Sequence, residues 1–449
     1  MTPPIDLGWT LQEITDAVGG RLVGDGSLSV SSVNTDTRDV LDGALFVALV
    51  GETFDGHSFT SNAIDGGATA VLVEEVAGCD AVPRVEVAST LDALLSLAAK
   101  RRSEISAPVV AITGSAGKTS TKDLIAAGMR DSWASPRSFN NEIGVPLTIL
   151  ATPNDATAVV VEVGSRGRGH IASLAKAVRP DVAVVTNLGV VHLETFGSTE
   201  ILADAKYELV EMLHSEGTAV LPDDESRLHR TQNPGTITFG AGPHAQIRIG
   251  AVSMNGEGYP SFDLMADGRS YPVSLSVAGS HQASNAAAAV GAAVSLGLDI
   301  ESFISGMEHA TGSAWRMDIH RGSFTVVNDS YNANPQSVAS ALATLADMDG
   351  GRRIAVLGPM AELGSVCEDE HRKMGEVATE VGLDAVVVIG PDHGYGLGAP
   401  QLVRNATDLE EAADTLHDIL EPGDVVLVKA SRSAGLERLA LALIEEATT

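Results

Sequence analysis

The chain has 449 residues, of which 44% are hydrophobic and 4% are aromatic, and its formal net charge at pH 7 is −30. A chain of this length is too long for one hydrophobic core, so we expect three domains of ordinary globular composition. The acidic surface excludes nucleic acid and anionic lipid as expected partners, because both carry negative charge and would be repelled.

The cysteines, the first ten residues and the apolar stretches indicate the cellular compartment. Cys79 and Cys367 lie far apart and have neither the spacing of a metal site nor that of a disulfide framework, which fits a reducing cytosol. The first ten residues lack the basic and apolar regions of a signal peptide. The stretch 286–298 is too short to span a bilayer, and we interpret it as a buried helix. We therefore expect a soluble, cytoplasmic protein without membrane insertion.

Residues 1–105 are the first predicted domain. Apolar runs at 44–50 and 68–74 predict strands, and 91–102 predicts an amphipathic helix. The segment between the strands, GETFDGHSF at 51–59, combines Gly, Asp and His in the manner of a loop.

Residues 106–313 are the second predicted domain, in which apolar strands alternate with helices. The predicted strands are 109–113, 158–163, 182–187 and 218–221. Their continuous Val, Ile and Ala runs indicate a parallel sheet buried on both faces. Alternating polarity around 236–277 predicts a small antiparallel insertion, followed by a helix at 281–296.

Residues 314–449 repeat the α/β alternation as a third, doubly wound domain. Strands are predicted at 324–328, 354–357, 385–389 and 425–429, and helices at 336–346, 368–381, 409–419 and 434–445. Ligands of such sheets bind beyond the carboxyl ends of the strands. Polar groups stand at four predicted strand ends, which favours one site shared by two domains; these groups are Glu162, Asn187, Asn328 with Asp329, and Lys429.

Residues 112–122, ITGSAGKTSTK, follow a buried strand and open a helix. A glycine-rich loop ending in Gly-Lys-Thr at this place is typical of a phosphate site, because the loop N–H groups and the helix N-terminus face an anion. Lys118 would contact the β- and γ-phosphates, and the Thr119 hydroxyl would hold Mg²⁺. The alternative is a glycine turn with a solvated lysine. The predicted nucleoside triphosphate site comprises Gly114, Ser115, Ala116, Gly117, Lys118, Thr119 and Ser120.

Three further residues suggest metal chemistry, each with a structural alternative. Glu162 interrupts an apolar strand and could bind Mg²⁺, or it could be a surface carboxylate at a strand end. His192 follows a buried strand, where a lone histidine is more often structural. Lys206 opens an amphipathic helix, DAKYELVEML, and could simply pair with Asp204 or Glu208 on a solvated face.

Two segments suggest ligand contacts around the second and third domains. His281 and Asn285 lie one turn apart on one helix face, where they could cap the helix and contact a ligand through its N-terminus, or simply be polar residues at a helix start. Asp329 could accept hydrogen bonds from a ribose hydroxyl, and the neighbouring asparagines could bind a polar substrate.

Arg316, at the boundary between the α/β series, is placed to reach a phosphate across a cleft. Its charge stands out because the chain as a whole is strongly acidic.

These segments resemble the Mur ligases, the ATP-dependent amide-forming ligases of peptidoglycan precursor synthesis. The resemblance follows the family's order along most of the chain, through ITGSAGKTSTK, SFNNEIGVPLT, VVEVGSRGRGHI, NLGVVHLETFGS, AKYELVE, GSHQASNA, WRMD and NDSYNANPQS. The stretch TDTRDVLDGALFVALVGETFDGHSF is similar to the family's uridine-nucleotide module. The implied fold is α/β in three domains: a small uridine-nucleotide module, a P-loop ATPase domain with a parallel sheet, and a Rossmann-like domain.

The resemblance implies roles for individual residues. Lys118, His192, Lys206 and Arg316 would be catalytic, with Lys206 carbamylated by CO₂. Two Mg²⁺ ions would be held by Thr119, Glu162, His192 and the modified Lys206. ATP would also contact Asn285, Arg316 and Asp329. Substrates would be bound by Thr37, Arg38, Asp55, His57, Asn140, Asn141, Asn332, Asn334, Ser431 and Arg432.

Within the family, SYNANP, AELG (361–364) and VKASRS (428–433) look most like the ligase that joins D-Ala-D-Ala to UDP-MurNAc-tripeptide through an acyl phosphate. The DNPR-type motif of the ligase that adds the third amino acid is absent from the sequence. The chain departs from the family pattern at Trp315, where a glycine is usual, at Gln282, where an asparagine is usual, and at Pro359, where an aspartate is usual. No departure removes a group that the chemistry requires.

Two rivals stay open at this point. A folylpolyglutamate synthase shares the central architecture but lacks the N-terminal module and the SYNANP segment. A non-enzymatic nucleotide switch would leave His192, Lys206 and the polar loop 328–334 unexplained. A monomer suits a three-domain enzyme with moving parts.

Overall fold

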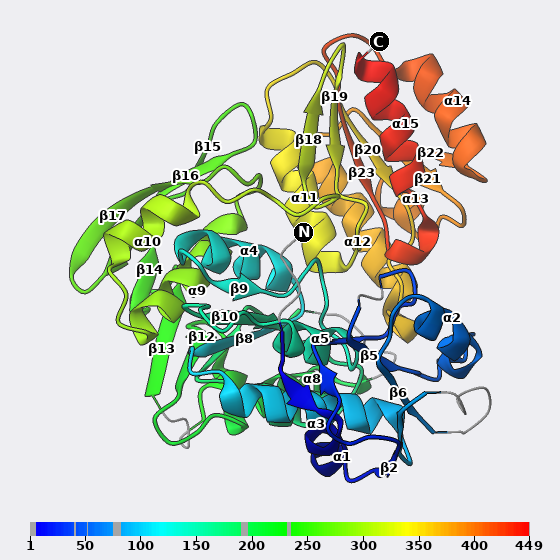
Figure 1. Ribbon diagram of the computed structural model, residues 1–449. Coiled ribbons are helices and arrows are strands. Elements are labelled where there is room, and N and C mark those ends of the chain that lie inside the picture. Colours follow the sequence, from blue (N-terminus) through cyan, green and yellow to red (C-terminus); the bar gives the residue numbers. More distant parts are fainter. Residues whose placement is uncertain are drawn as a thin grey trace.

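The computed structural model describes residues 6–39, 42–51, 53–74, 82–189, 196–230 and 235–448. Three α/β units follow one another along the chain, each around its own sheet (Figure 1). The predicted α/β class is confirmed, whereas the limits 1–105, 106–313 and 314–449 stay predictions. Cys79 and His192 lie outside the described residues. None of the helices in the described part of the chain combines the length and apolar character that a bilayer span requires.

The first unit contains a five-stranded sheet in the order β2-β7-β6-β5-β4, parallel from β4 to β7, with β2 antiparallel at one edge. Its elements are β1 (Trp9–Thr10), α1 (Leu11–Val18), β2 (Arg21–Val23), β3 (Ser29–Val30), β4 (Ser32–Asn34), β5 (Ala44–Val47), η1 (Gly56–Phe59), α2 (Thr60–Asp65), β6 (Ala70–Val73), β7 (Arg84–Glu86) and α3 (Thr90–Glu104). The predicted strands and helix are therefore present. Helix α1 begins at a capping box in which the Thr10 hydroxyl accepts from the Glu13 N–H and the Glu13 carboxylate accepts from the Thr10 N–H.

The central unit contains a ten-stranded sheet in the order β15-β16-β14-β13-β12-β11-β8-β10-β9, with β17 paired to β16. Its strands are β8 (Val109–Thr113), β9 (Trp133–Ala134), β10 (Val159–Glu162), β11 (Val182–Val185), β12 (Thr218–Pro222), β13 (Gly235–Gly240), β14 (Ile247–Ile249), β15 (Ser253–Met254), β16 (Pro260–Ala266) and β17 (Arg269–Ser274). All pairs from β9 to β14 are parallel. The predicted buried parallel sheet is confirmed.

The segment 236–277, where antiparallel strands were predicted, continues the central sheet. Strands β13 and β14 continue the parallel sheet, and β16 then pairs antiparallel with β14, β15 and β17 at its far edge. The alternating polarity along β16 identified the antiparallel part correctly, because every second side chain is buried there. The predicted antiparallel strands are therefore confirmed; that they extend the edge of the central sheet could not be predicted, because alternation says nothing about which strand a new strand joins.

Helices cover both faces of the central sheet. Helices α4 (Lys118–Gly128), α9 (Gln282–Ser295) and α10 (Ile300–Met307) pack on one face, and α5 (Gly144–Leu150), α6 (His170–Val178) and α8 (Thr199–Glu211) pack on the other. A short turn, η2 (Ser226–Leu228), follows β12. The alanine-rich α9 is buried from Asn285 to Ala293, which confirms the buried helix predicted at 286–298 except at its end, since α9 stops at Ser295 and Leu298 is exposed.

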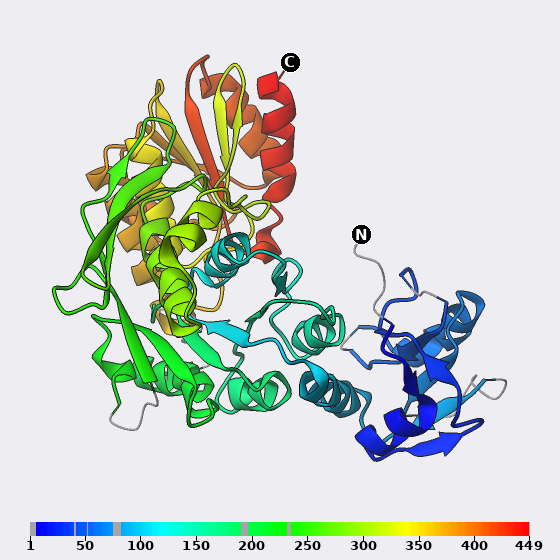
Figure 2. The same ribbon diagram turned by 60° about the vertical axis from the view of Figure 1, so that its left-hand side comes forward.

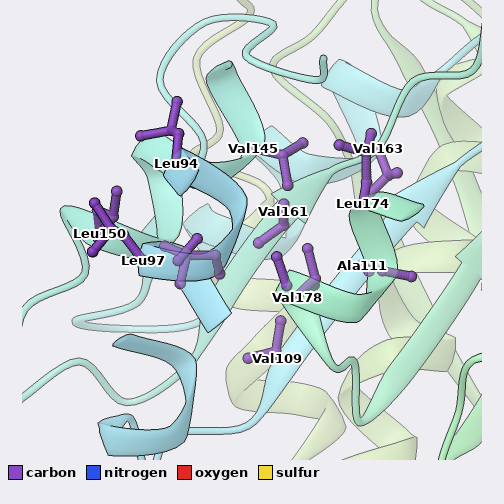
Figure 3. Close-up of a cluster of buried hydrophobic side chains, with 14 of the residues drawn as sticks. Leu94, Leu97, Val109, Ala111, Val145, Leu150, Val161, Val163, Leu174 and Val178 are labelled. Atoms are coloured by element: carbon purple, nitrogen blue, oxygen red, sulfur yellow. The ribbon is translucent and has the colours of Figure 1, made fainter. Parts of the chain in front are cut away.

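Helix α3 belongs to the first unit by sequence but also packs against the central one. Figure 3 shows Leu94 and Leu97 of α3 beside Val145 of α5, Val161 of β10 and Leu174 of α6, in one continuous apolar cluster. The buried guanidinium at the end of α3 fixes this contact, because Arg102 donates to the carbonyl oxygens at 178 and 179 and to the carboxylate at 181 at 2.9–3.1 Å. The first unit therefore projects from one end of the central unit and away from the third (Figure 2).

The third unit contains a six-stranded sheet in the order β18-β19-β23-β20-β21-β22, parallel except for β18. Its elements are β18 (Asp318–Arg321), β19 (Thr325–Asn328), α11 (Pro335–Asp347), β20 (Arg353–Leu357), η3 (Gly364–Val366), α12 (Cys367–Glu380), β21 (Ala385–Ile389), α13 (Tyr395–Gly398), β22 (Val403–Ala406), α14 (Leu409–Ile419), β23 (Val425–Lys429), η4 (Arg432–Ala434) and α15 (Glu437–Thr448). Helices α11 and α12 pack on one face and α14 and α15 on the other. The predicted doubly wound arrangement is confirmed.

Candidate functional site

A cavity of about 1040 Å³ lies between the central and third units, at the carboxyl ends of their parallel strands. Of the predicted strand-end residues, Glu162, Asn187, Asp329 and Lys429 line it, whereas Asn328 is fully buried and does not. Predicted site residues that line the same cavity are Ser115, Ala116, Gly117, Lys118, Thr119, Ser120, Asn140, Asn141, Lys206, Asn285, Arg316, Asn332, Asn334, Ser431 and Arg432. The two sheets therefore determine where the site lies, because the carboxyl ends of parallel strands all lie at the same edge of a sheet.

The glycine-rich loop runs from the end of β8 to the start of α4 and forms one wall. Gly114 and Gly117 have φ of +146° and +78°, and a Cβ on Gly117 would lie 2.3 Å from the Asn285 side-chain oxygen. Only glycine fits this turn and this close approach. The loop is fixed from β11, because the Ala116 N–H donates to the Asn187 side chain at 2.9 Å.

Lys118 begins helix α4 and points back along the loop. Its ammonium donates to the carbonyl oxygen of Gly114 at 2.8 Å. Burial lowers the pKa of Lys118, the charge of Glu162 opposes this shift, and the charge of Arg316 adds to it. The hydrogen bonds of the ammonium group are therefore to neutral carbonyl oxygens. A phosphate oxygen in their place would form a stronger hydrogen bond, because both partners would be charged.

Thr119 and Glu162 form a buried group of oxygen donors beside Lys118. The Thr119 hydroxyl donates to the Glu162 carboxylate at 2.8 Å, and the Asn140 amide donates to its other oxygen at 2.7 Å. Glu162 is 1% exposed, and no Lys or Arg of the described residues forms an ion pair with it. A buried carboxylate that accepts only from a hydroxyl and an amide of the described residues is the kind of donor set that Mg²⁺ prefers. The surface alternative for Glu162 is wrong, because the side chain is buried.

Lys206 lies inside helix α8, which begins at Thr199, and its side chain is 2% exposed. Burial lowers the pKa of Lys206 well below its ordinary value, and the charge of Lys118 lowers it further. Asp204 pairs with Arg230 at 2.7 Å, and Glu208 accepts from backbone N–H groups at the start of α6. The solvated-pair alternative for Lys206 is therefore wrong for the described residues, whereas His192 lies outside them.

Arg316 bridges the two units across the cavity. Its guanidinium donates to the Ser138 hydroxyl at 3.1 Å and lies 4.0 Å from the centre of the Tyr331 ring. The Ser138 oxygen is 3.2 Å from the Thr119 hydroxyl oxygen, so a continuous hydrogen-bonded path leads from Arg316 to Glu162. The arrangement places one cation of the junction next to the predicted metal and phosphate positions.

The polar loop after β19 is held by the neighbouring strand β23. The Lys429 ammonium donates to the Asp329 carboxylate at 2.6 Å and to the carbonyl oxygen of Asn332 at 2.9 Å. Asn334 caps α11, because its side chain accepts from the Ser337 N–H at 2.9 Å. Part of the loop's polarity therefore serves the turn and the helix cap.

The start of α9 forms the opposite wall. The Asn285 amide donates to the Gln282 side chain at 2.8 Å. His281 occupies the N-cap position but its side chain makes no cap hydrogen bond, and its Nδ1 is buried without a partner among the described residues. Burial lowers the pKa of His281; Asp329 opposes this shift and Lys429 adds to it. The prediction that His281 caps the helix is wrong. Its Nδ1 could still accept a hydrogen bond from a ligand.

The remaining predicted residues have local roles or lie elsewhere. Asn141 accepts from the Gly144 N–H at 2.8 Å and so holds the start of α5. Ser431 accepts from the Ala361 N–H at 2.8 Å. Thr37, Arg38, Asp55 and His57 lie in the first unit, outside this cavity.

In the first unit, Asp55 and His57 form a compact pair. The His57 N–H groups of the backbone and of Nδ1 donate to the Asp55 carboxylate at 3.0 and 2.6 Å, and its Nε2 accepts from the Glu74 N–H at 2.9 Å. Both ring nitrogens are thus already bonded. Arg38 is exposed and pairs with Asp36, which lowers the pKa of that carboxyl to about 2.

Sequence reasoning did not assign several cavity residues. Ser138, Arg166, His170 and Glu362 either line the cavity or contact the residues that line it. Ser138, Arg166 and Glu362 stand in loops and His170 is the first residue of α6, so no periodic signal separated them from ordinary turn or helix-start residues. Lys429 had such a signal, a charge at the end of an apolar strand.

Comparisons with known proteins cover nearly the whole chain. Family models match at residues 29–103 (Mur ligase family, catalytic domain), 112–293 (Mur ligase middle domain) and 315–432 (Mur ligase, glutamate ligase domain). A UDP-N-acetylmuramoyl-tripeptide--D-alanyl-D-alanine ligase of Synechocystis is 36% identical over 443 residues, which cover 94% of each protein.

Solved structures agree with this similarity. Crystal structure I of MurF from Acinetobacter baumannii has a TM-score of 0.91 and 28% identity, and the match covers 98% of this chain and 100% of that one. A MurF ligase from Thermotoga maritima, solved in complex with ADP, has a TM-score of 0.83 and 29% identity, covering 92% and 97%.

Proposed function

This chain belongs to the Mur ligase family, and we propose on that basis that it is an ATP-dependent amide-forming ligase acting on peptidoglycan precursors. It joins D-Ala-D-Ala to UDP-MurNAc-tripeptide and yields UDP-MurNAc-pentapeptide, ADP and phosphate. The observation that carries the proposal is the cavity in which a phosphate loop, a buried oxygen-donor set and a bridging arginine meet.

The reaction has two steps. The terminal carboxylate of the tripeptide attacks the γ-phosphorus of ATP, so that an acyl phosphate forms and ADP leaves. The amine of D-Ala-D-Ala then attacks the acyl carbonyl, loses a proton, and expels phosphate as the amide bond forms. Both partners of the first step are anionic, so the enzyme's main task is to neutralise charge.

Lys118 and Arg316 supply positive charge from opposite sides of the cavity. Lys118 would exchange the carbonyl of Gly114 for phosphate oxygens, and Arg316 would turn from Ser138 to the γ-phosphate. Because an acyl phosphate hydrolyses in water, the third unit would have to close over the cavity that it shares with the central unit to protect the intermediate.

Thr119 and Glu162 would hold one Mg²⁺, and His192 with carbamylated Lys206 would hold a second. When bound, Mg²⁺ would supply positive charge beside the transferring phosphoryl oxygens. The buried hydroxyl and carboxylate support the first site.

Carbamylation of Lys206 is supported by its burial. The lowered pKa of Lys206 favours the neutral amine, which is the form that attacks CO₂, with release of one proton. The product is a carboxylate-like oxygen ligand in place of a cation. Carbon-13 NMR of protein equilibrated with labelled bicarbonate tests this step: a carbamate signal is expected from the wild type and not from Lys206→Arg.

We assign the nucleoside of ATP to Asn285 and Asp329, and the peptide substrates to Asn140, Asn141, Asn332, Asn334, Ser431 and Arg432. The uridine nucleotide would be bound by the first unit through Thr37, Arg38, Asp55 and His57. We further propose that the protein acts as a monomer in the cytoplasm, where its nucleotide-linked substrates and ATP would be available.

Phosphate release from ATP and Mg²⁺ with UDP-MurNAc-tripeptide, with and without D-Ala-D-Ala, tests the function when the product is identified by mass. Release that requires both substrates and gives UDP-MurNAc-pentapeptide is expected. Turnover with glutamate or a diamino acid instead of D-Ala-D-Ala would contradict the assigned substrate but not the ligase chemistry. ATP binding without turnover of any amine would instead favour the non-enzymatic nucleotide switch.

A further inference from the structure

The segment that carries Arg316 has an unusual backbone. It joins α10, which ends at Met307, to β18, which begins at Asp318, without regular secondary structure. Trp315 and Met317, on either side of Arg316, have φ of +63° and +50°. A bulky side chain in the left-handed region is strained, and such strain persists only where the surroundings hold it.

The third unit holds this turn at two backbone positions. The Tyr331 N–H donates to the Trp315 carbonyl oxygen at 3.1 Å, and the Met317 N–H donates to the Asp329 carboxylate at 3.1 Å. Both bonds would also form with a glycine at position 315, which would adopt the same φ without strain. The turn and its two backbone hydrogen bonds therefore do not require the indole ring.

The indole ring contacts a second cation of the cavity. The Arg432 guanidinium lies 4.6 Å from the centre of the Trp315 ring, and a 3.5 Å ion pair with Glu437 orients it. Arg432 comes from η4, at the end of β23, so the contact ties the junction segment to the rigid sheet of the third unit.

We propose that Trp315 and Arg432 form a clasp that positions Arg316 for the γ-phosphate of ATP. The clasp adds a side-chain restraint to the two backbone bonds and holds the Arg316 backbone so that its guanidinium faces the cavity beside Ser138, from which it would turn to the γ-phosphate. Trp315 is thus a positioning residue, and it acts only on the phosphate that Arg316 reaches. The inference rests on the proposed ATP-dependent function and deepens it.

Binding of two nucleotides by calorimetry tests the clasp, because Arg316 distinguishes them. The non-hydrolysable analogue AMP-PNP carries a γ-phosphate and ADP does not. Trp315→Gly removes the ring and relieves the backbone strain, and Arg432→Met removes the cation while keeping a long side chain. We expect each variant to weaken AMP-PNP binding by about twofold to fivefold, the range of a partly exposed cation–π contact, and to leave ADP binding unchanged.

Three controls make the result decisive. Trp315→Phe retains an aromatic face and should restore AMP-PNP binding. The double variant should bind AMP-PNP no more weakly than either single variant, since one contact is removed only once. Thermal denaturation checks folding, and Arg432→Met, at an exposed side chain, keeps the test available if Trp315→Gly fails to fold.

Equal loss of ADP and AMP-PNP binding would show a merely structural role and overturn the clasp. Multiplying effects in the double variant would also overturn it. A wild-type protein that binds neither nucleotide would contradict the proposed function itself, which is a separate result.

Discussion

The pair of Lys429 and Asp329 allows a stringent test of how the third unit holds the cavity wall. Their side chains are 2% and 12% exposed, and the ammonium lies 2.6 Å from the carboxylate. Lys429→Met would leave the carboxylate buried with one remaining donor, the Met317 N–H at 3.1 Å. It would also remove the hydrogen bond to the Asn332 carbonyl.

Removing one partner of a buried ion pair costs about 3–5 kcal/mol, because the remaining charge stays buried without compensation. Strands β19 and β23 are neighbours, with Asn328 opposite Val428, so the loss should lower the free energy of opening both. Hydrogen exchange followed by mass spectrometry measures this opening. Peptides that span the two strands should exchange roughly a hundredfold to a few thousandfold faster in Lys429→Met.

The matched control is Lys429→Met combined with Asp329→Asn. The asparagine removes the uncompensated charge and can still accept from the Met317 N–H, so exchange in the double variant should return most of the way to wild type. Exchange that rises less than about fivefold in the single variant, or stays as fast in the double variant, would refute the reasoning.

Three further outcomes are expected. Glu162→Gln should raise the Mg²⁺ concentration needed for half-maximal activity by at least about tenfold, with the melting temperature nearly unchanged; equal Mg²⁺ dependence in the two proteins would remove Glu162 from the site. Asn334→Ala should lower the stability of α11 by about 1 kcal/mol in urea titrations, whereas Asn334→Ser should not, since serine can also cap a helix. Burial lowers the pKa of the His371 side chain below its value in the unfolded chain, so the unfolded state binds the proton more readily and the free energy of unfolding should fall as pH decreases below about 6.5. Urea titrations of His371→Gln should show a weaker fall with pH, and an equal fall in both proteins would show that His371 does not cause it.

The regular elements could be predicted where local composition decides them. The strands β8, β21 and β23 coincide with their predicted runs, because a parallel strand buried on both faces must be apolar throughout. Pairing could not be predicted in the same way. The two-residue strand β9 and the continuation of the sheet through β13 and β14 depend on neighbours distant in sequence.

The site was predictable to the extent that strand ends and the glycine-rich loop define it. Lys206 shows the limit: its burial follows from the packing of α8 in three dimensions, and its sequence neighbours Asp204 and Glu208 suggested an exposed pair. Ser138 and the stacking of Arg432 on Trp315 are contacts between loops, for which no periodic pattern exists.

The position of α3 has a consequence for how this protein can be divided. The helix lies between the first sheet and the helices of the central unit, and one apolar cluster runs through all of them. A cut at residue 105 follows the change in sequence composition. It would nevertheless remove α3 from the central unit and expose apolar side chains of the shared cluster such as Val145 and Ile149. Fragments or chimaeras that exchange the first unit should therefore leave α3 with the central unit it covers. Because this core is shared, we expect the first unit to move together with the central unit and not to rotate on its own.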